Sequence, residues 1–242
     1  EVFECTGYFT SVEGASKHIK AGAKKVIISA PAKGDAKTIV YNVNHNTLTT
    51  DDSIISAASC TTNCLAPVLN VLENNIGIEA GFMTTVHSYT NDQATLDIAH
   101  KKGEYSRRGR ACAANIVPTS TGAATAIGKV IPSLNGRMSG SALRVPTITG
   151  SMIDLTLELK RPVTKEEINE LFTNNQNETI KVTNDPIVSC DVIGEATGAL
   201  VDGLLTEVLV DEDGTELVKV VAWYDNELGY TKQMIRTMNV LI

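Results

Sequence analysis

The chain has 242 residues, of which 43% are hydrophobic and 20% are charged. This composition is typical of globular proteins and differs from that of disordered or membrane-spanning chains. The formal net charge of -7 argues against nucleic-acid binding, because phosphate backbones are bound by clustered Lys and Arg. No apolar stretch approaches the roughly 20 residues that a transmembrane helix needs. We therefore expect no nucleic-acid partner and no membrane partner.

The cysteines indicate a reducing compartment. There are five of them, an odd number, at irregular spacing, which fits free thiols better than a disulfide framework. A zinc site would need a pair of ligands at matching spacing elsewhere in the chain, and no such pair is present. We expect a cytoplasmic protein without a metal site.

Residues 1–59 have the pattern of an α/β sheet. Four short segments rich in β-branched residues, bounded by Gly, Pro, Asn or Asp, predict strands at 2–5, 25–29, 38–43 and 53–58. Between the first two, the spacing of Val12, Ala15 and Ile19 predicts a helix over 12–21.

The middle of the chain alternates helix, strand and loop. Apolar spacing predicts a helix over 60–74, in which Pro67 implies a kink or a late start. Residues 81–90 predict a strand, and helical spacing resumes over 121–134. Residues 91–118 are polar and without sustained period, and a loop of that length in a compact domain is usually functional.

The last third predicts an antiparallel sheet and two helices. Residues 151–160 alternate apolar and polar, as in a sheet with one wet face. Thr164 and Glu167 form a capping-box pair that opens a helix to about Asn174. Residues 203–210, the turn DEDG and residues 215–225 predict a hairpin. The final helix, 229–242, should direct inward Met234, Ile235, Met238 and Leu241.

Two cysteines stand four residues apart where the fourth predicted strand gives way to a helix. That spacing places Cys60 and Cys64 on one helical face, with Cys60 at the mouth and Cys64 one turn deeper. The helix dipole and the free amides of the first turn favour a thiolate, so we expect the pKa of Cys60 to fall below its ordinary value. The alternative is that both are small buried hydrophobes, as most intracellular cysteines are.

Two other side chains are candidates for a site. His87 ends an apolar strand, where active-site groups gather in α/β sheets, although a half-buried structural histidine is the alternative. Arg144 lies between apolar strand residues and needs an anion, which could be a bound phosphate or carboxylate, or else Asp92 or Asp154. Thr121 and Gly122 begin a helix and offer a second terminus suited to anions.

Six motifs follow one another along the chain: SCTTNCLAP (59–67), TTVHSYTNDQ (84–93), RRGR (107–110), PTSTGAA (118–124), ALRVPT (142–147) and WYDNELGY (223–230). In this order they closely resemble the phosphorylating, glycolytic type of glyceraldehyde-3-phosphate dehydrogenase, over the whole chain. SCTTNC followed by TVHSYTND is the specific part, whereas RRGR or TG alone would carry little information.

The resemblance implies an NAD-dependent oxidoreductase that converts D-glyceraldehyde 3-phosphate and inorganic phosphate to 1,3-bisphosphoglycerate through a cysteine thioester. Cys60 would be the nucleophile and His87 the base. By the family pattern, Thr90, Arg108 and Arg144 would bind the substrate phosphate. The attacking phosphate would be bound by Ser59, Thr61, Thr121 and Gly122, with Arg144 shared. Asn226 would anchor the nicotinamide carboxamide, with Tyr230 nearby, and Thr6, Gly7 and Ser29 would line the cofactor groove.

The resemblance also implies the architecture, an α/β plus α+β fold. Residues 1–59 would be the C-terminal part of a Rossmann-type dinucleotide-binding domain. Residues 60–225 would form a catalytic domain with a mixed, largely antiparallel sheet and helices on one face, and 226–242 a helix returning to the first domain. The G-x-G-x-x-G fingerprint is absent, so we expect the first half of the cofactor domain to be missing upstream and this chain alone to bind NAD weakly.

Two departures from the family pattern leave questions open. Ile98-Ala99-His100 stands where many NAD-preferring members have Leu-Pro before the histidine, so NADP is not excluded although the motifs favour NAD. The loop from His100 to Arg107 is slightly longer than in many relatives, and in the family it packs at the subunit contacts of a homotetramer. The alternative functions are a related erythrose-4-phosphate dehydrogenase and a non-catalytic binding or adhesion module.

Overall fold

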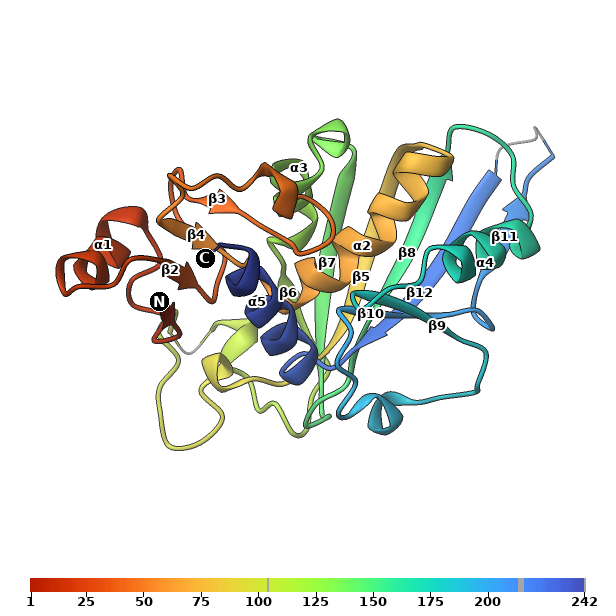
Figure 1. Cartoon of the computed structure of the whole chain (residues 1–242). Helices are drawn as coiled ribbons and strands as arrows, with labels where there is room; N and C mark the ends of the chain where they lie inside the picture. The colour runs from red at the N-terminus through yellow and green to blue at the C-terminus, as the bar shows by residue number, and fades with distance from the viewer. Residues whose placement is uncertain (104, 213–215, 242) are drawn as a thin grey trace.

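Two β-sheets joined by helices make up the structure, a computed structural model that describes residues 1–103, 105–212 and 216–241. The small sheet lies beside the two termini, and the large sheet fills the other end of the molecule (Figure 1). Among the described residues, no helix combines the length and the apolarity that crossing a bilayer requires.

The small sheet is parallel, with the strand order β1-β2-β4-β3. Its strands are β1 (Val2–Glu4), β2 (Val26–Ile28), β4 (Ile54–Ser56) and β3 (Lys37–Thr38). Helix α1 (Val12–Lys20) packs Ala15 against Val26 and Ile28 on one face. Helix α5 (Leu228–Leu241) packs its methionines against Ile27 and neighbouring residues on the other face. Because both faces are covered, every residue of β2 is buried, as is usual for parallel sheets.

Two predictions for this region were wrong. The strand predicted over 38–43 stops at Thr38, because Asn42 is left-handed with a φ of 60° and the Asn44 side chain turns the backbone. The Asn44 amide accepts from the Val40 N–H and donates to the Thr38 carbonyl, at 2.8 Å each. In α5, Ile235 is 40% exposed rather than inward, since it lies about 100° around the helix from buried Met234.

The large sheet has eight strands in the order β6-β7-β5-β8-β12-β10-β9, with β11 paired to β12. Among the described residues of this sheet, only the pairs β5–β7 and β9–β10 are parallel, which confirms the mixed, largely antiparallel sheet. The bounds are β5 (Ile78–Ser88), β6 (Val117–Ser120), β7 (Met138–Val145), β8 (Ser151–Leu159), β9 (Ile180–Thr183), β10 (Ala199–Asp202), β11 (Glu207–Val210) and β12 (Glu216–Tyr224).

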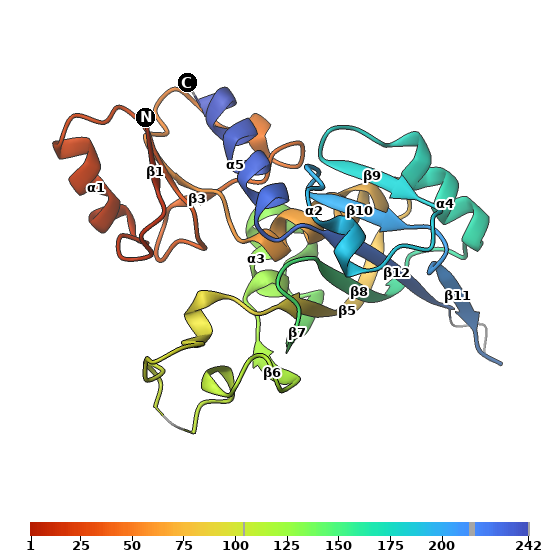
Figure 2. The same ribbon diagram turned by 90° about the horizontal axis from the view of Figure 1, so that it is seen from below.

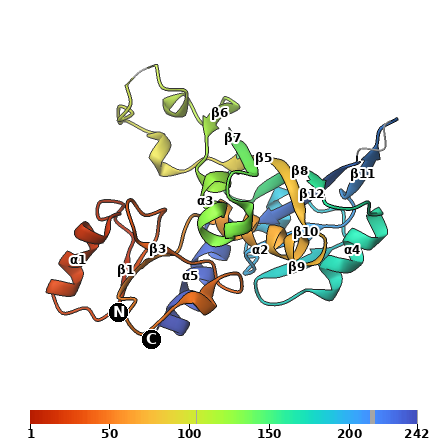
Figure 3. The same ribbon diagram turned by 90° about the horizontal axis from the view of Figure 1, so that it is seen from above.

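Helices cover one face of this sheet, as predicted: α2 (Cys60–Asn75), α3 (Ala123–Val130) and α4 (Lys165–Asn174) lie together on that side (Figure 3). Leu69 of α2, Ile127 of α3 and Leu155 of β8 belong to the same core. The alternation predicted for 151–160 is confirmed, because the odd-numbered residues of β8 are buried. The opposite face is open, and Phe82 of β5 is 70% exposed there.

Helix ends differ from the sequence prediction at two places. Helix α2 begins at Cys60 and contains Pro67, so the late start was wrong. Helix α3 ends at Val130, and Pro132 opens a separate 3-10 turn, η4 (Pro132–Leu134). The Thr164 hydroxyl caps α4 by accepting from the Glu167 N–H, while the Glu167 carboxylate binds Arg161.

The connecting segments include four further 3-10 turns. These are η1 (His45–Thr47), η2 (Asn91–Gln93), η3 (Arg107–Gly109) and η5 (Ser189–Val192). Residues 91–103 and 105–116 extend away from both sheets as a long loop (Figure 2), as predicted for 91–118, although β6 already begins at Val117. The hairpin of β11 and β12 is confirmed, although its strand starts at Glu207 rather than 203. Residues 213–215, which include part of the predicted DEDG turn, lie outside the described residues.

Candidate active site

A sharp turn between β4 and α2 presents Cys60. Ala58 in this turn is left-handed, with a φ of 59°, a conformation that costs an alanine roughly 1–2 kcal/mol. Ser59 is the N-cap of α2, and its hydroxyl accepts from the Thr62 N–H at 3.1 Å. Cys60 is therefore the first residue of the helix, where amides lack helical acceptors and the dipole is positive.

The imidazole of His87 lies beside this thiol. His87 is on β5 and 3% exposed, and its Nε2 is 3.4 Å from the Sγ of Cys60. Its Nδ1 is 2.7 Å from the carbonyl oxygen of Ser88. Nδ1 also lies 2.9 Å from the Nη1 of Arg144, which can only donate, but the two protons of that Nη1 are directed to the Ser88 carbonyl and the Thr90 hydroxyl. Because the Ser88 carbonyl can only accept, we assign the proton to Nδ1 and the lone pair to Nε2, facing the thiol. The Tyr224 ring packs edge-on against His87, with centroids 5.9 Å apart, and holds the imidazole in this orientation.

Burial sets the protonation of the pair. It raises the pKa of the Cys60 thiol, and this outweighs the charge of Arg144 and hydrogen bonds from Thr61, which lower it. The lowered pKa predicted from the helix terminus was therefore wrong in direction, because the sequence does not show how deeply the sulfur is buried. Burial, with the nearby charge of Arg144, lowers the pKa of His87 to about 4. At neutral pH the pair is a thiol and a neutral imidazole, and the imidazole is free to accept a proton.

Arg144 projects from β7, in register with His87 on β5. Its Nη1 donates to the Ser88 carbonyl and to the Thr90 hydroxyl, at 2.9 Å each. Its Nε is buried and has no hydrogen-bond partner among the described residues. A buried donor left unpaired is costly unless a ligand accepts from it, so the guanidinium is suited to an anion.

The ion pairs considered for Arg144 are made by other cations. Asp92 accepts from Arg108, and Asp154 lies 3.3 Å from Lys219. Neither carboxylate forms a salt bridge with Arg144 within the described part of the chain, which favours the anion-binding alternative over the structural one.

A cavity of about 180 Å³ brings most of the predicted residues together. It is lined by Pro31, Ser59, Cys60, Thr61, Thr85, His87, Arg108, Ser120, Thr121, Gly122, Ala123, Ala142 and Arg144. Thr90 is not among them, but its hydroxyl accepts from Arg144. The N-termini of α2 and α3 and two guanidinium groups border this space, and helix N-termini and Arg both favour bound anions.

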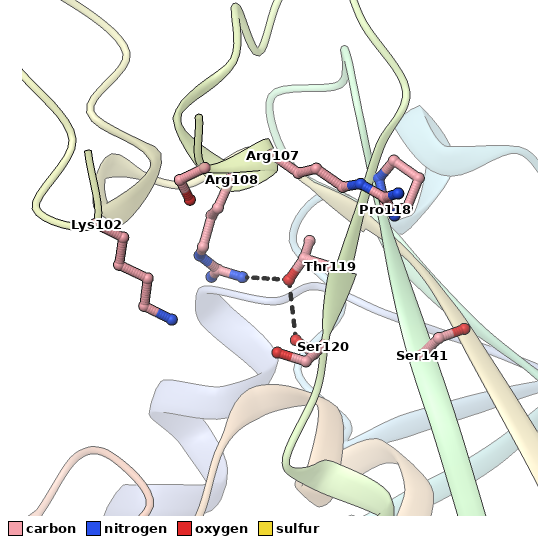
Figure 4. Close-up of a pocket in the computed structure, with 8 residues that line it drawn as sticks. Lys102, Arg107, Arg108, Pro118, Thr119, Ser120 and Ser141 are labelled. Carbon is pink, nitrogen blue, oxygen red and sulfur yellow. Dashed lines mark hydrogen bonds between the residues drawn. The ribbon is translucent and has the colours of Figure 1, made fainter. Parts of the chain in front are cut away.

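A larger hollow of about 650 Å³ adjoins the cavity and shares Arg108 and Ser120 with it. Figure 4 shows Arg108 next to Thr119, whose hydroxyl accepts from its Nη1 at 2.9 Å, while Lys102 points toward the same space. Its lining contains three cationic side chains and no acidic one among the described residues. The approach to the cavity is therefore electropositive.

The predicted cofactor residues lie apart from the cavity lining. Thr6, Gly7 and Ser29 follow the carboxyl ends of β1 and β2, where α/β sheets bind ligands. Asn226 is 7% exposed, and its Oδ1 accepts from the Ser151 hydroxyl at 2.9 Å. Its Nδ2 has no acceptor among the described residues and is available to a ligand. The Tyr230 hydroxyl donates to the Ala58 carbonyl at 3.1 Å.

Tyr224 and Thr85 support this site and were not among the predicted residues. The Tyr224 hydroxyl lies 2.9 Å from the Thr61 hydroxyl and 2.9 Å from the Thr85 hydroxyl, and so links α2 to β5 beneath His87. Strand alternation places Thr85 on the same side as His87, so the sequence held a signal for Thr85. Tyr224 comes from a distant strand, and only the folded sheet brings it here.

The remaining thiols lie outside the cavity. Cys64 is buried, with its Sγ 4.0 Å from the Ala222 carbonyl oxygen, one turn below Cys60 as predicted. All five cysteines lie in the described ranges and are free. No cluster of three or more His, Cys, Asp or Glu suited to a metal ion occurs among the described residues.

Comparison with known proteins matches residues 59–226 to the family described as "Glyceraldehyde 3-phosphate dehydrogenase, C-terminal domain". The chain is 56% identical over 237 residues to a protein named glyceraldehyde-3-phosphate dehydrogenase from Clostridium pasteurianum, covering 98% of this chain and 70% of that protein. It is 55% identical to the protein of the same name from Clostridium acetobutylicum and 52% identical to that from Streptococcus pyogenes, with the same coverage.

Proposed function

Because this chain belongs to the glyceraldehyde-3-phosphate dehydrogenase family, we propose that Cys60 is the nucleophile and His87 the base of its reaction. The family comprises NAD-dependent oxidoreductases of glycolysis, which convert glyceraldehyde 3-phosphate and phosphate to 1,3-bisphosphoglycerate. One observation carries the assignment of residues: the Cys60 Sγ lies 3.4 Å from the His87 Nε2 inside a cavity bordered by Arg144 and two helix N-termini.

In the first step the thiol adds to the aldehyde. The sulfur forms a bond to the carbonyl carbon as its proton passes to Nε2 of His87 and on to the carbonyl oxygen, which gives a hemithioacetal. The substrate phosphate binds Arg144, Arg108 and Thr90. It offsets the charge of Arg144 beside Nδ1, which raises the pKa of His87 from about 4 when the substrate is in place.

In the second step the hemithioacetal is oxidised to a thioester. His87 takes the hydroxyl proton as the carbon loses its hydrogen as a hydride. Cys60 then holds the acyl group as a thioester, which remains activated for transfer, whereas an oxygen ester of serine would be less reactive. The neutral imidazole at Nε2 supports this role, because a protonated His87 could not accept the proton.

In the third step inorganic phosphate releases the product. A phosphate oxygen bonds to the thioester carbon, the carbon–sulfur bond breaks, and protonated His87 returns its proton to the sulfur. Ser59, Thr61, Thr121 and Gly122 are the residues proposed for this phosphate, and each lines the cavity. The unpaired Nε of Arg144 supports its sharing between the two anions.

The cofactor's reactive end has fitting residues in this chain. NAD, when bound, accepts the hydride. The unpaired amide nitrogen of Asn226, held by Ser151 through its oxygen, is suited to a carboxamide oxygen. Thr6, Gly7 and Ser29 are proposed for the groove at the ends of β1 and β2, and Tyr230 lies in the first turn of α5, which begins two residues after Asn226.

The test compares aldehydes and variants on this chain. Reduction of NAD by glyceraldehyde 3-phosphate should require inorganic phosphate and vanish in Cys60→Ser, and erythrose 4-phosphate should react more slowly. Acyl transfer can be followed without the cofactor by supplying acetyl phosphate: the Cys60 sulfur takes the acetyl group and phosphate leaves. Acetylation of Cys60 by mass spectrometry is expected in the wild type. If Cys190, which is exposed, is acetylated at the same rate as Cys60, the proposed site is wrong.

The division into domains is likewise a proposal: 1–59 with the cofactor domain, 60–225 as the catalytic domain and 226–242 as a returning helix. The separate cores support it, because Met234, Met238 and Leu241 of α5 pack with Ile27 and Ile55 of the small sheet rather than with the large core. Limited proteolysis that releases 60–225 as a stable fragment is the expected result.

We also propose a homotetramer in the cytoplasm. The open face of the large sheet supports assembly, because Phe82 and Leu217 are exposed there and apolar surface of this kind is often covered by a subunit. The five free thiols support a reducing compartment. Light scattering of the purified chain measures its oligomeric state.

A further inference from the structure

We propose that Asn63 is a positioning residue that holds Cys60 against His87 by clamping the left-handed turn at Ala58. The inference rests on the proposed function, since it concerns the reactivity of the same thiol. Asn63 lies in the first turns of α2 and is 2% exposed. Asn63 is not among the residues that line the cavity, so it has no contact with reacting atoms that would make it catalytic.

The amide of Asn63 spans the turn. Its Nδ2 donates to the Ala57 carbonyl at 2.8 Å and to the Ser59 carbonyl at 3.0 Å. These are the carbonyls on either side of Ala58, the residue with a φ of 59°. Both amide protons are used to fix one backbone conformation, which alanine does not favour by itself.

Asparagine is an unexpected residue at this buried position of α2. The residues that follow in α2, such as Leu65 and Leu69, are fully buried and apolar, and a buried amide is costly unless it is hydrogen-bonded. Asparagine also has low helix propensity. The two bonds across the turn give this position a reason to be polar.

The rest of the turn is held in the same way. The Ser56 hydroxyl accepts from the Ala58 N–H at 3.1 Å and donates to the Ala30 carbonyl at 2.6 Å. The Tyr230 hydroxyl donates to the Ala58 carbonyl. Gly198 approaches Asn63 from the other side, since a Cβ at Gly198 would lie 2.7 Å from the Asn63 carbonyl oxygen. A backbone conformation this tightly surrounded is one that the fold maintains against its local cost.

The turn controls the thiol because Cys60 is two residues beyond Ala58. Relaxation of Ala58 to a negative φ would redirect Ser59 and the first turn of α2. The Sγ would then leave its position 3.4 Å from Nε2, and the thiol would lose its base without any change to the base itself.

The experiment measures the rate of alkylation of Cys60 by iodoacetamide on the whole chain, with peptide mapping to separate the thiols. Asn63→Ala should slow Cys60 at neutral pH by about tenfold or more, a loss comparable to removing one or two buried hydrogen bonds. The matched control is Asn75→Ala in the same helix, where the lost bond is from Nδ2 to the Val71 carbonyl. It should leave the rate unchanged.

The decisive variant combines Asn63→Ala with Ala58→Gly. Glycine adopts a positive φ without the cost that alanine has, so the double variant should recover about fivefold of the lost rate. It should also fold if the single variant does not. The proposal is overturned if the double variant reacts as slowly as Asn63→Ala, or if neither the single nor the double variant folds. In either case Asn63 would act through packing rather than through the turn.

The same data distinguish this inference from the proposed function. If Cys60 of the wild type reacts no faster than exposed Cys5 and Cys190, and His87→Asn does not slow it, the proposed function fails. If Cys60 of the wild type reacts faster than Cys5 and Cys190 and His87→Asn slows it, but Asn63→Ala reacts at the wild-type rate at every pH, the positioning role alone fails.

Discussion

Replacing His87 by asparagine tests the proposed base, and its effect should depend on pH. In the structure burial raises the pKa of the Cys60 thiol and lowers that of His87 to about 4. Between these two pKa values the sulfur is protonated and the imidazole is neutral. Alkylation of Cys60 in this range therefore requires His87 to accept the proton, and His87→Asn removes the acceptor.

The magnitude follows from these protonation states. A thiol with an ordinary pKa of about 8.5 is roughly 3% ionised at pH 7, and burial reduces this fraction for Cys60. A positioned general base contributes about 10²–10⁴-fold. We expect His87→Asn to slow alkylation about a hundredfold at pH 7, and the two rates to converge above the pKa of the thiol. The wild-type rate should also fall as the pH drops through about 4, because His87 is then protonated and cannot accept the proton.

Iodoacetamide labelling at a series of pH values, with peptide mapping, gives the rate for each cysteine. Cys5 and Cys190 are exposed and serve as internal controls whose rates should be equal in the two proteins. A ratio of wild-type to variant rate that is constant from pH 6 to high pH would refute the reasoning, as would a ratio below about threefold at pH 7.

Three further predictions concern stability. Tyr224→Phe leaves the hydroxyls of Thr61 and Thr85 without their shared partner and should lower the free energy of unfolding in urea by about 1–3 kcal/mol, whereas Tyr8→Phe, at an 82% exposed residue, should not. Gly150 has a φ of 89°, and a Cβ there would lie 2.1 Å from the Ser189 carbonyl oxygen, whereas Gly194 has a φ of 92° and open space around a Cβ. Gly150→Ala should therefore lower the melting temperature more than Gly194→Ala does. Equal losses in the two variants would contradict the steric argument. Burial raises the pKa of Glu4, but hydrogen bonds from Thr6 and His18 outweigh burial and lower that pKa. The resulting stabilisation is present above the unfolded pKa of about 4.5 and is lost as the pH falls below that value. The difference in the free energy of unfolding between wild type and Glu4→Gln should therefore be largest near neutral pH and disappear in acid.

Local patterns were sufficient for most elements. The alternation in residues 151–160 predicted the buried face of β8, and the apolar spacing after Ser59 predicted α2, because periodicity reports which side of an element faces a core. It failed where a side chain competed with the backbone, as at Asn44, whose amide replaces strand pairing after Thr38. It also failed for Ile235, where hydrophobicity alone did not show which side of the helix packs.

The site was predicted in part. Motif order brought Cys60, His87 and Arg144 to attention, and the cavity contains all three. The protonation of Cys60 was not predictable, since the helix terminus is visible in the sequence but the depth of burial is not. The role of Tyr224 depends on contacts between elements that are far apart in the chain. The role of Asn63 depends on a turn whose backbone conformation the sequence does not specify.

By itself the sequence determined the family chemistry: a thiol at the start of a helix, a histidine at the end of a strand and an arginine that needed an anion, in an order that few proteins share. The tertiary structure decided what local patterns leave open, namely the 3.4 Å distance from sulfur to Nε2, the tautomer of His87 and the unpaired Nε of Arg144. The physical reason is that distances, burial and proton positions arise from packing between segments far apart in the chain. Periodicity and motif spacing describe only neighbours along it.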